Sequence, residues 1–104
     1  DLYPRHLLVE EGDLGGVIDW GDAHRGDPAV DLSLVLGWLD PGDRAAFEAA
    51  YGPLDPATEA RAWFRVLYYG VVLDQVGALL EDAPLRAIGR AYRSRARSQP
   101  LAVA

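Results

Sequence analysis

The sequence predicts a mainly helical α+β protein, in which one short β-hairpin precedes four helices. Two observations lead to this fold class. Two short apolar runs, 7–9 and 16–19, are separated by residues 11–15, which have the composition of a hairpin loop. After residue 26, Pro and Gly divide the chain into segments that carry apolar residues at helical spacing.

The composition restricts the class of protein. The 104 residues contain no cysteine, which excludes disulfides and thiol chemistry and agrees with a reducing compartment, so we expect a cytoplasmic protein. Hydrophobic residues make up 50% of the chain, enough for one packed domain, yet no apolar run is long enough to span a membrane. The net charge of −6 argues against a nucleic-acid partner, because phosphate backbones attract basic surfaces.

The strands are predicted at residues 6–10 and 16–19. If they pair antiparallel, Asp1 and His6 at the start of the first lie at the same edge as Asp19 at the end of the second. Carboxylates that converge there suit metal-assisted phosphoryl transfer, in which one carboxylate orients the attacking hydroxyl and other groups hold Mg²⁺. We therefore expect Asp1 to act as the base, with Asp19 and His6 as metal ligands.

Helices are predicted at residues 27–39, 44–51, 56–80 and 83–98. All four predicted starts carry an Asp N-cap or a Pro in the first turn, and the first and third have both, in Asp27-Pro28 and Asp55-Pro56. The third helix is long and apolar on most sides, which is typical of a helix in the middle of a bundle.

Three motifs occur in order near the start of the chain: Asp1-x-x-x-x-His6, Ile18-Asp19-Trp-Gly-Asp22 and Gly26-Asp-Pro-Ala-Val-Asp31-Leu. Together they resemble the catalytic core of the aminoglycoside phosphotransferase family, a branch of the protein-kinase-like fold. Macrolide phosphotransferases of that family carry a similar Asp-Leu-x-Pro-x-His-Leu segment. The resemblance implies a carboxy-terminal lobe, with catalytic and metal-binding loops in residues 1–32 and a helical, substrate-side subdomain in 33–104.

The resemblance also implies the reaction and its cofactors. Mg²⁺ and ATP or GTP would serve the transfer of a phosphoryl group to a hydroxyl of a small molecule, such as an aminoglycoside, a macrolide or a related metabolite. Kinase-like enzymes grip the nucleotide phosphates with a lysine and a Gly-rich loop. This sequence contains no lysine. We therefore expect that grip in an amino-terminal lobe outside these residues, and no activity from the 104 residues alone.

Carried onto this sequence, the family's motif places the base at Asp1 and the metal ligands at His6 and Asp19. His6 stands where the family usually has Asn. Imidazole is a softer ligand than the Asn oxygen, so the metal preference or the coordination mode would differ from that of the family. Asp22 would reach a second metal or a bridging water, or else cap a turn. Asp31 would support catalysis by accepting a backbone N–H of the catalytic loop, or else is a first-turn Asp favoured by the helix dipole.

Apolar side chains surround these predicted ligands. By the same resemblance, Leu8 and Ile18 form the apolar floor beneath the adenine, although both would also be apolar if they only packed on the helices. Trp20 follows the metal-binding Asp and is expected to be buried behind it, holding that carboxylate in place.

In the third helix, Asp74 lies one turn from a glycine on either side, which predicts a groove with a carboxylate in it. The groove would admit a substrate amino group; alternatively the helices pack closely and an arginine of the last helix bonds Asp74. Tyr68 and Tyr69 are further candidates for substrate contact. Two other functions also stay open: a non-catalytic remnant that only binds, and a helical interaction domain.

Overall fold

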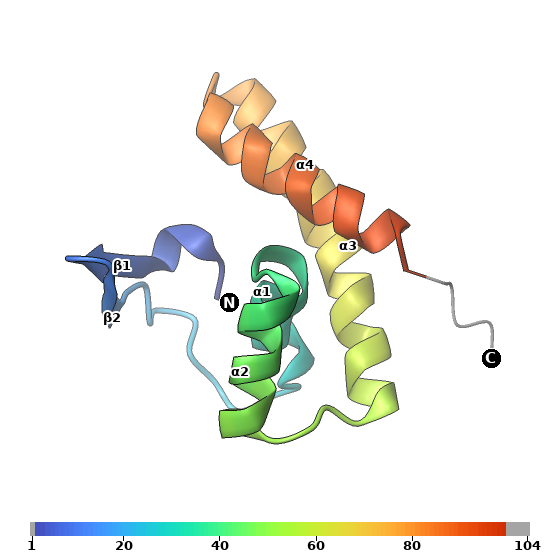
Figure 1. Cartoon of the computed structure of the whole chain (residues 1–104). Helices are drawn as coiled ribbons and strands as arrows, with labels where there is room; N and C mark the ends of the chain where they lie inside the picture. Colours follow the sequence, from blue (N-terminus) through green and yellow to red (C-terminus); the bar gives the residue numbers. More distant parts are fainter. Residues whose placement is uncertain (1, 100–104) are drawn as a thin grey trace.

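The computed structural model describes residues 2–99 and shows the predicted mainly helical α+β fold (Figure 1). A two-stranded sheet projects from one side of four helices. Within residues 2–99, no helix has both the length and the apolar composition needed to cross a bilayer. In chain order the elements are a 3₁₀ turn η1 (Pro4–His6), strands β1 (Leu7–Glu10) and β2 (Asp13–Val17), and helices α1 (Ala29–Trp38), α2 (Pro41–Tyr51), α3 (Pro56–Leu79) and α4 (Ala83–Arg97).

The hairpin is tighter than the sequence predicts. Strands β1 and β2 pair antiparallel, and the two residues between them, Glu11 and Gly12, have φ values of 50° and 86°. Positive φ at both central residues is the geometry of a two-residue hairpin turn, whose twist matches that of the strands. Strand β2 therefore runs from Asp13 to Val17. The strand predicted at 16–19 is confirmed for 16–17, but it begins earlier than predicted, and Ile18 and Asp19 lie beyond its end.

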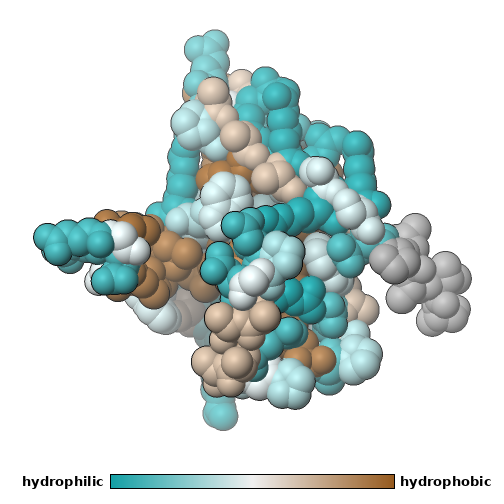
Figure 2. All heavy atoms as spheres, in the orientation of Figure 1, coloured by the Kyte–Doolittle hydropathy of each residue, from teal (hydrophilic) through white to brown (hydrophobic). Residues whose placement is uncertain are grey.

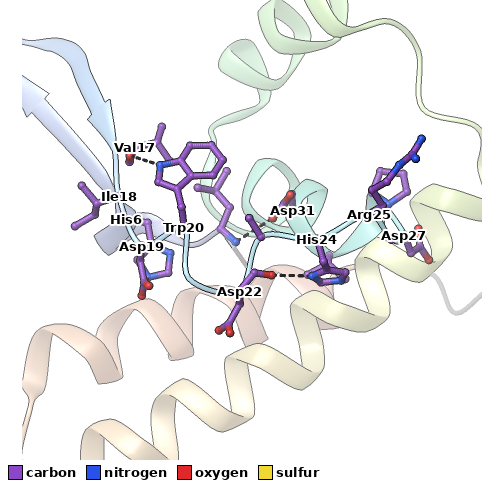
Figure 3. A pocket seen from close by; sticks show the side chains of 15 residues that line it. His6, Val17, Ile18, Asp19, Trp20, Asp22, His24, Arg25, Asp27 and Asp31 are labelled. Carbon is purple, nitrogen blue, oxygen red and sulfur yellow. Dashed lines mark hydrogen bonds and ion pairs between the residues drawn. The ribbon is translucent and has the colours of Figure 1, made fainter.

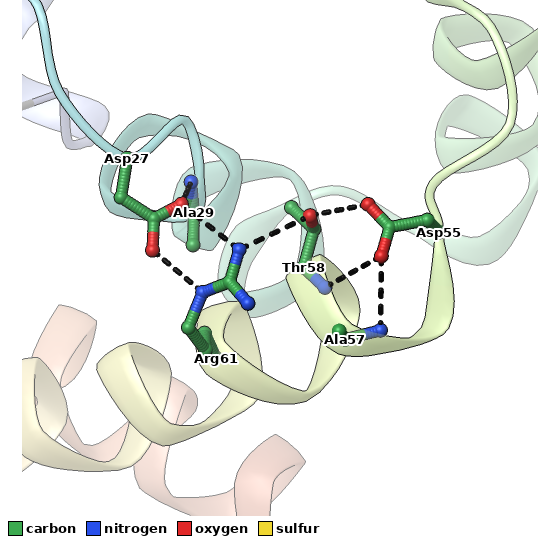
Figure 4. A network of polar contacts seen from close by, with 6 residues as sticks. All are labelled: Asp27, Ala29, Asp55, Ala57, Thr58 and Arg61. Carbon is green, nitrogen blue, oxygen red and sulfur yellow. Dashed lines mark hydrogen bonds and ion pairs between the residues drawn. The ribbon is translucent and has the colours of Figure 1, made fainter.

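The starts of α1 and α3 are joined by one arginine (Figure 4). The Asp55 carboxylate accepts the Thr58 amide at 3.1 Å and so caps α3, while the Asp27 carboxylate accepts the Ala29 amide at 3.0 Å and caps α1. Arg61 donates to Asp27 at 2.6 Å and also reaches the Thr58 hydroxyl at 3.3 Å. The caps predicted from the Asp-Pro pairs thus form, and Arg61 fixes one helix start against the other.

Helix α1 lies against α3 and α4, and the core forms where the three meet. The Tyr92 ring of α4 is fully buried and lies directly on Gly37 of α1, where an added Cβ would be 3.0 Å from the ring. Helices α3 and α4 approach backbone to backbone: a Cβ on Gly89 would lie 2.7 Å from the Gly70 carbonyl oxygen and also meet the Asp74 amide. This close approach fixes α3 and α4 as one unit.

The Gly89→Ala substitution tests this packing. The new methyl group would meet the α3 backbone, which cannot rotate away, so we expect a loss of about 1–3 kcal/mol in the free energy of unfolding, measured by urea titration. Gly42→Ala is the matched control, because nothing lies within 4 Å of a Cβ there. It should be neutral or stabilise the protein by up to about 1 kcal/mol. Equal stability of the two variants would contradict the close approach of α3 and α4.

Candidate functional site

Two of the predicted ligands meet at the base of the hairpin. The Ile18 amide donates to the His6 carbonyl at 2.8 Å, which extends the strand pairing by one step and sets the next residue, Asp19, beside the imidazole. The His6 Nε2 and Asp19 Oδ2 atoms are 3.2 Å apart. Asp19 has a φ of 66°, a left-handed conformation that costs a residue with a Cβ about 1–2 kcal/mol. Asp19 therefore has an energetically unfavourable backbone conformation at the point where the two side chains meet.

Asp31 contacts the backbone of the loop that contains the predicted base. Its Oδ1 atom accepts the Leu2 amide at 3.0 Å. Burial acts to raise the pKa of the Asp31 carboxyl, whereas the hydrogen bond from the Leu2 amide acts to lower it. Asp1, the predicted base, lies outside the described residues.

An open pocket of about 600 Å³ lies beside the pair (Figure 3). His6, Asp19 and Asp31 all line it, and most of the remaining wall comes from the loop between β2 and α1. Asp22 lines the same pocket, and its backbone carbonyl is 2.7 Å from the His24 Nδ1 atom. No group of three or more His, Asp or Glu side chains in residues 2–99 is arranged to hold a metal. Asp22 therefore does not complete a trio with the other two predicted ligands.

The apolar residues around the pair face outward. Trp20 is 68% exposed, and its Nε1 atom donates to the Val17 carbonyl at 2.8 Å, so the ring lies over the end of β2. The prediction that Trp20 is buried behind Asp19 is wrong. Leu8 and Ile18 are also about half exposed, which disfavours the alternative that they only pack on the helices. Figure 2 shows the apolar surface that covers the hairpin behind its polar tip.

Helices α3 and α4 hold the loop that carries His6. The Tyr3 ring meets the His6 ring edge-on at a centroid distance of 4.3 Å and meets the Tyr69 ring of α3 at 5.9 Å. Arg5 donates to the Asp82 carboxylate, at the turn between α3 and α4, at 2.6 Å. Sequence reasoning missed the roles of Tyr3, Arg5 and Asp82. Asp82 carried a signal, because it precedes the Ala-Pro start of α4, but nothing in the sequence indicated its partner.

Asp74 is bonded to arginines of the last helix, which is the second of the two alternatives given by the sequence and not the open groove. Its buried carboxylate accepts Arg86 at 3.1 Å and Arg93 at 2.8 Å, and Arg90 lies 3.6 Å away. The Arg86 hydrogen bond is the main reason that the pKa of Asp74 lies below its usual range. The two glycines that predicted a groove are covered by Arg86 and Arg93. Tyr68 is 53% exposed and lies beside the Arg65 guanidinium.

The hairpin, the pocket loop and α1 lie within a stretch that matches a known family. The model of the phosphotransferase enzyme family matches residues 1–65 of the 104. The chain therefore belongs to the phosphotransferase enzyme family. No curated protein and no solved structure matches the chain.

The ion pair between Arg5 and Asp82 predicts an acid limit to stability. Arg5 holds the pKa of the Asp82 carboxyl below its ordinary value. A carboxyl whose pKa is lowered on folding stabilises the protein above its unfolded pKa of about 3.9 and loses that contribution as the pH falls through the folded value. We expect urea midpoints to be level between pH 7 and 5 and to fall below about pH 4.

Arg5→Gln should lower the urea midpoint at pH 7. It should also make the decrease in the urea midpoint at acid pH smaller, because Asp82 then no longer contributes to that decrease. Arg97→Gln is the control. It removes the same charge, but Arg97 is exposed at the end of α4. If the two variants have the same pH dependence, the Arg5–Asp82 contact contributes nothing to stability in solution.

Proposed function

We propose that the protein acts in the transfer of the γ-phosphoryl group of ATP or GTP to a hydroxyl of a small molecule, an aminoglycoside or macrolide antibiotic or a related metabolite. Membership of the phosphotransferase enzyme family supports phosphoryl transfer. The observation that carries the proposal is the His6–Asp19 pair, whose facing atoms are 3.2 Å apart beside an open pocket.

The pair fits a divalent cation. Adjacent ligands of an octahedral Mg²⁺, at bond lengths of 2.0–2.1 Å, are about 3 Å apart, close to the distance found between the His6 and Asp19 atoms. The Asp19 side chain is 64% exposed, so the remaining positions are open to phosphate oxygens and water, as is usual for Mg²⁺. Once bound, such an ion neutralises the charge that develops on the transferred phosphate. The imidazole favours a softer ion, so Mn²⁺ should bind more tightly than Mg²⁺.

The other residues would serve this pair. In the proposal, Asp1 orients and deprotonates the acceptor hydroxyl, and Asp31 fixes the loop through the Leu2 amide, 3.0 Å away. The exposed apolar surface at Leu8 and Ile18 is suited to the adenine or guanine base. The chain would act as the carboxy-terminal lobe of a kinase-like fold. An amino-terminal lobe outside these residues would grip the nucleotide phosphates, and the helical part, residues 33–104, would face the acceptor.

One observation favours a second candidate, a remnant that binds a ligand without transferring phosphate. Among residues 2–99, only two of the three predicted ligands come together, and no trio of ligating side chains forms. A site with two protein ligands needs the nucleotide phosphates to complete it. Metal binding that depends on the nucleotide therefore separates the two candidates.

Nucleotide-dependent metal binding tests the pair directly. We expect Mn²⁺, followed by its electron paramagnetic resonance signal, to bind in the presence of ATP or GTP, and Asp19→Ala to weaken this binding more than about tenfold because it removes the only carboxylate of the pair. Asp13→Ala, at the turn end of the hairpin, is the matched control and should bind like the parent. His6→Asn should shift the preference from Mn²⁺ toward Mg²⁺. Unchanged binding in Asp19→Ala would refute the assignment of the pair.

Turnover tests the proposed division between two lobes. The 104 residues incubated with ATP or GTP, Mg²⁺ and a panel of aminoglycosides and macrolides should give no phosphorylated product, because they contain no lysine to hold the nucleotide phosphates. The measurement is mass spectrometry of the acceptor. Turnover that Asp19→Ala abolishes would show that the second lobe is unnecessary.

A further inference from the structure

A series of aromatic rings runs from the core to the His6–Asp19 pair. The fully buried Tyr92 lies 6.4 Å from the Tyr69 ring, measured between centroids. Tyr69 meets Tyr3 at 5.9 Å and an interplanar angle of 74°, and Tyr3 meets His6 at 4.3 Å and 87°. The last two contacts have the edge-to-face orientation that aromatic pairs prefer. The series therefore connects α4 and α3 to the imidazole through Tyr3, the residue just before η1.

The hairpin holds His6 through the Ile18 amide and Asp19, but it does not attach the imidazole to the helices. Strands β1 and β2 contact chiefly each other and project from the helices (Figure 1). His6 is nevertheless only 8% exposed, and the Tyr3 ring packs directly against it. The His6 amide also donates to the Tyr3 carbonyl at 2.9 Å, within the same turn. The backbone and the ring of Tyr3 therefore both contact His6 and form its link to the helices.

Tyr69 is in turn well anchored. Its ring contacts the core residue Tyr92 and also the Arg65 guanidinium, whose Cζ atom is 4.7 Å from the ring centroid. Burial raises the pKa of the Tyr69 hydroxyl, and the Asp19 carboxylate contributes in the same direction, which places the phenol within electrostatic reach of the pair. Tyr68, the next residue back along α3, is 53% exposed by contrast.

We propose that Tyr69 is a positioning residue for the metal ligand His6, and that it acts through the Tyr3 ring. The inference rests on the proposed function, because it assigns Tyr69 to the metal-binding pair. It gives Tyr69 an internal role in place of the substrate contact predicted from the sequence. It also makes α3, the helix proposed to face the acceptor, the support of a metal ligand, so a shift of α3 changes the orientation of the imidazole.

The test compares Tyr69→Ala and Tyr69→Leu with the conservative Tyr69→Phe. Phe64→Ala is the control, because Phe64 is an aromatic residue of the same helix but is 71% exposed. The first readout needs no metal: the ring resonances of His6 and the nuclear Overhauser effects between the Tyr3 and His6 rings, recorded at one fixed pH. The second is Mn²⁺ affinity in the presence of ATP or GTP, and urea unfolding confirms that each variant is folded.

We expect Tyr69→Ala and Tyr69→Leu to shift the His6 resonances, to weaken the contacts between the Tyr3 and His6 rings and to lower Mn²⁺ affinity about tenfold, an effect typical of residues that orient a metal ligand. Tyr69→Phe should keep all of these near the parent values, because it keeps the ring, and Phe64→Ala should leave them unchanged. Tyr69→Leu preserves most of the apolar volume, so it provides the answer if Tyr69→Ala does not fold.

Unchanged His6 resonances in a folded Tyr69→Leu protein would overturn the inference. A Tyr69→Phe variant that loses as much affinity as Tyr69→Ala would also overturn it, because the hydroxyl and not the ring would then be responsible. If the parent protein binds no Mn²⁺ but Tyr69→Leu shifts the His6 ring resonances, then Tyr69 does position His6 and the proposed function fails. The two proposals can therefore fail separately.

Discussion

The candidate site depends on how the segment before the hairpin is attached to the helices. Residues 2–6 carry His6, and the strands that follow contribute little support beyond their own pairing. Three interactions of different kinds attach the segment: the Leu2 amide binds Asp31 of α1, the Tyr3 ring meets α3, and Arg5 pairs with the turn between α3 and α4. Because three elements take part, the segment is held against rotation as well as translation.

This attachment has value only if the helices themselves are fixed relative to one another. Two of the three attachment points lie on α3 or on its turn into α4, and these helices touch backbone to backbone at Gly70 and Gly89. The buried Asp74 then binds Arg86 and Arg93, which lie two turns apart on α4, so it fixes the axial register of the two helices. A buried carboxylate is costly unless it is paired, and here arginines on two turns supply partners. The glycines and Asp74 thus serve the site from a distance.

The sequence predicted what local chemistry determines. The Asp-Pro signals located the starts of α1 and α3, because an N-cap carboxylate and a proline of fixed φ act on the residues beside them. The convergence of His6 and Asp19 followed from the pairing of two neighbouring runs, even though the strand was placed too late. That error came from Glu11, whose positive φ shortens the turn to two residues. A positive φ is hard to predict from sequence at residues other than glycine and asparagine.

The remaining features depend on contacts between residues far apart in sequence. Tyr3 meets Tyr69, and Asp74 meets Arg93, only after the helices have packed, and hydrophobic periodicity does not identify such partners. For Asp74 both alternatives agreed with the sequence, a groove for substrate or close helix packing, and only the packed helices distinguish them. Trp20 shows the same limit: its burial was predicted from its place after the metal-binding Asp, whereas the ring is 68% exposed beyond the left-handed turn at Asp19.

The two members of the pair differ in freedom, and this difference bears on how they would bind an ion. His6 is buried and enclosed by Tyr3, so its ring loses little further entropy when it binds. Asp19 is mostly exposed, and its left-handed backbone directs the side chain from the end of the hairpin into the open pocket. In the proposed function, a fixed imidazole beside an adjustable carboxylate would allow the site to admit phosphates of varying position while one ligand stays in place. The rigid half of that arrangement comes from the helices, and the adjustable half from the hairpin.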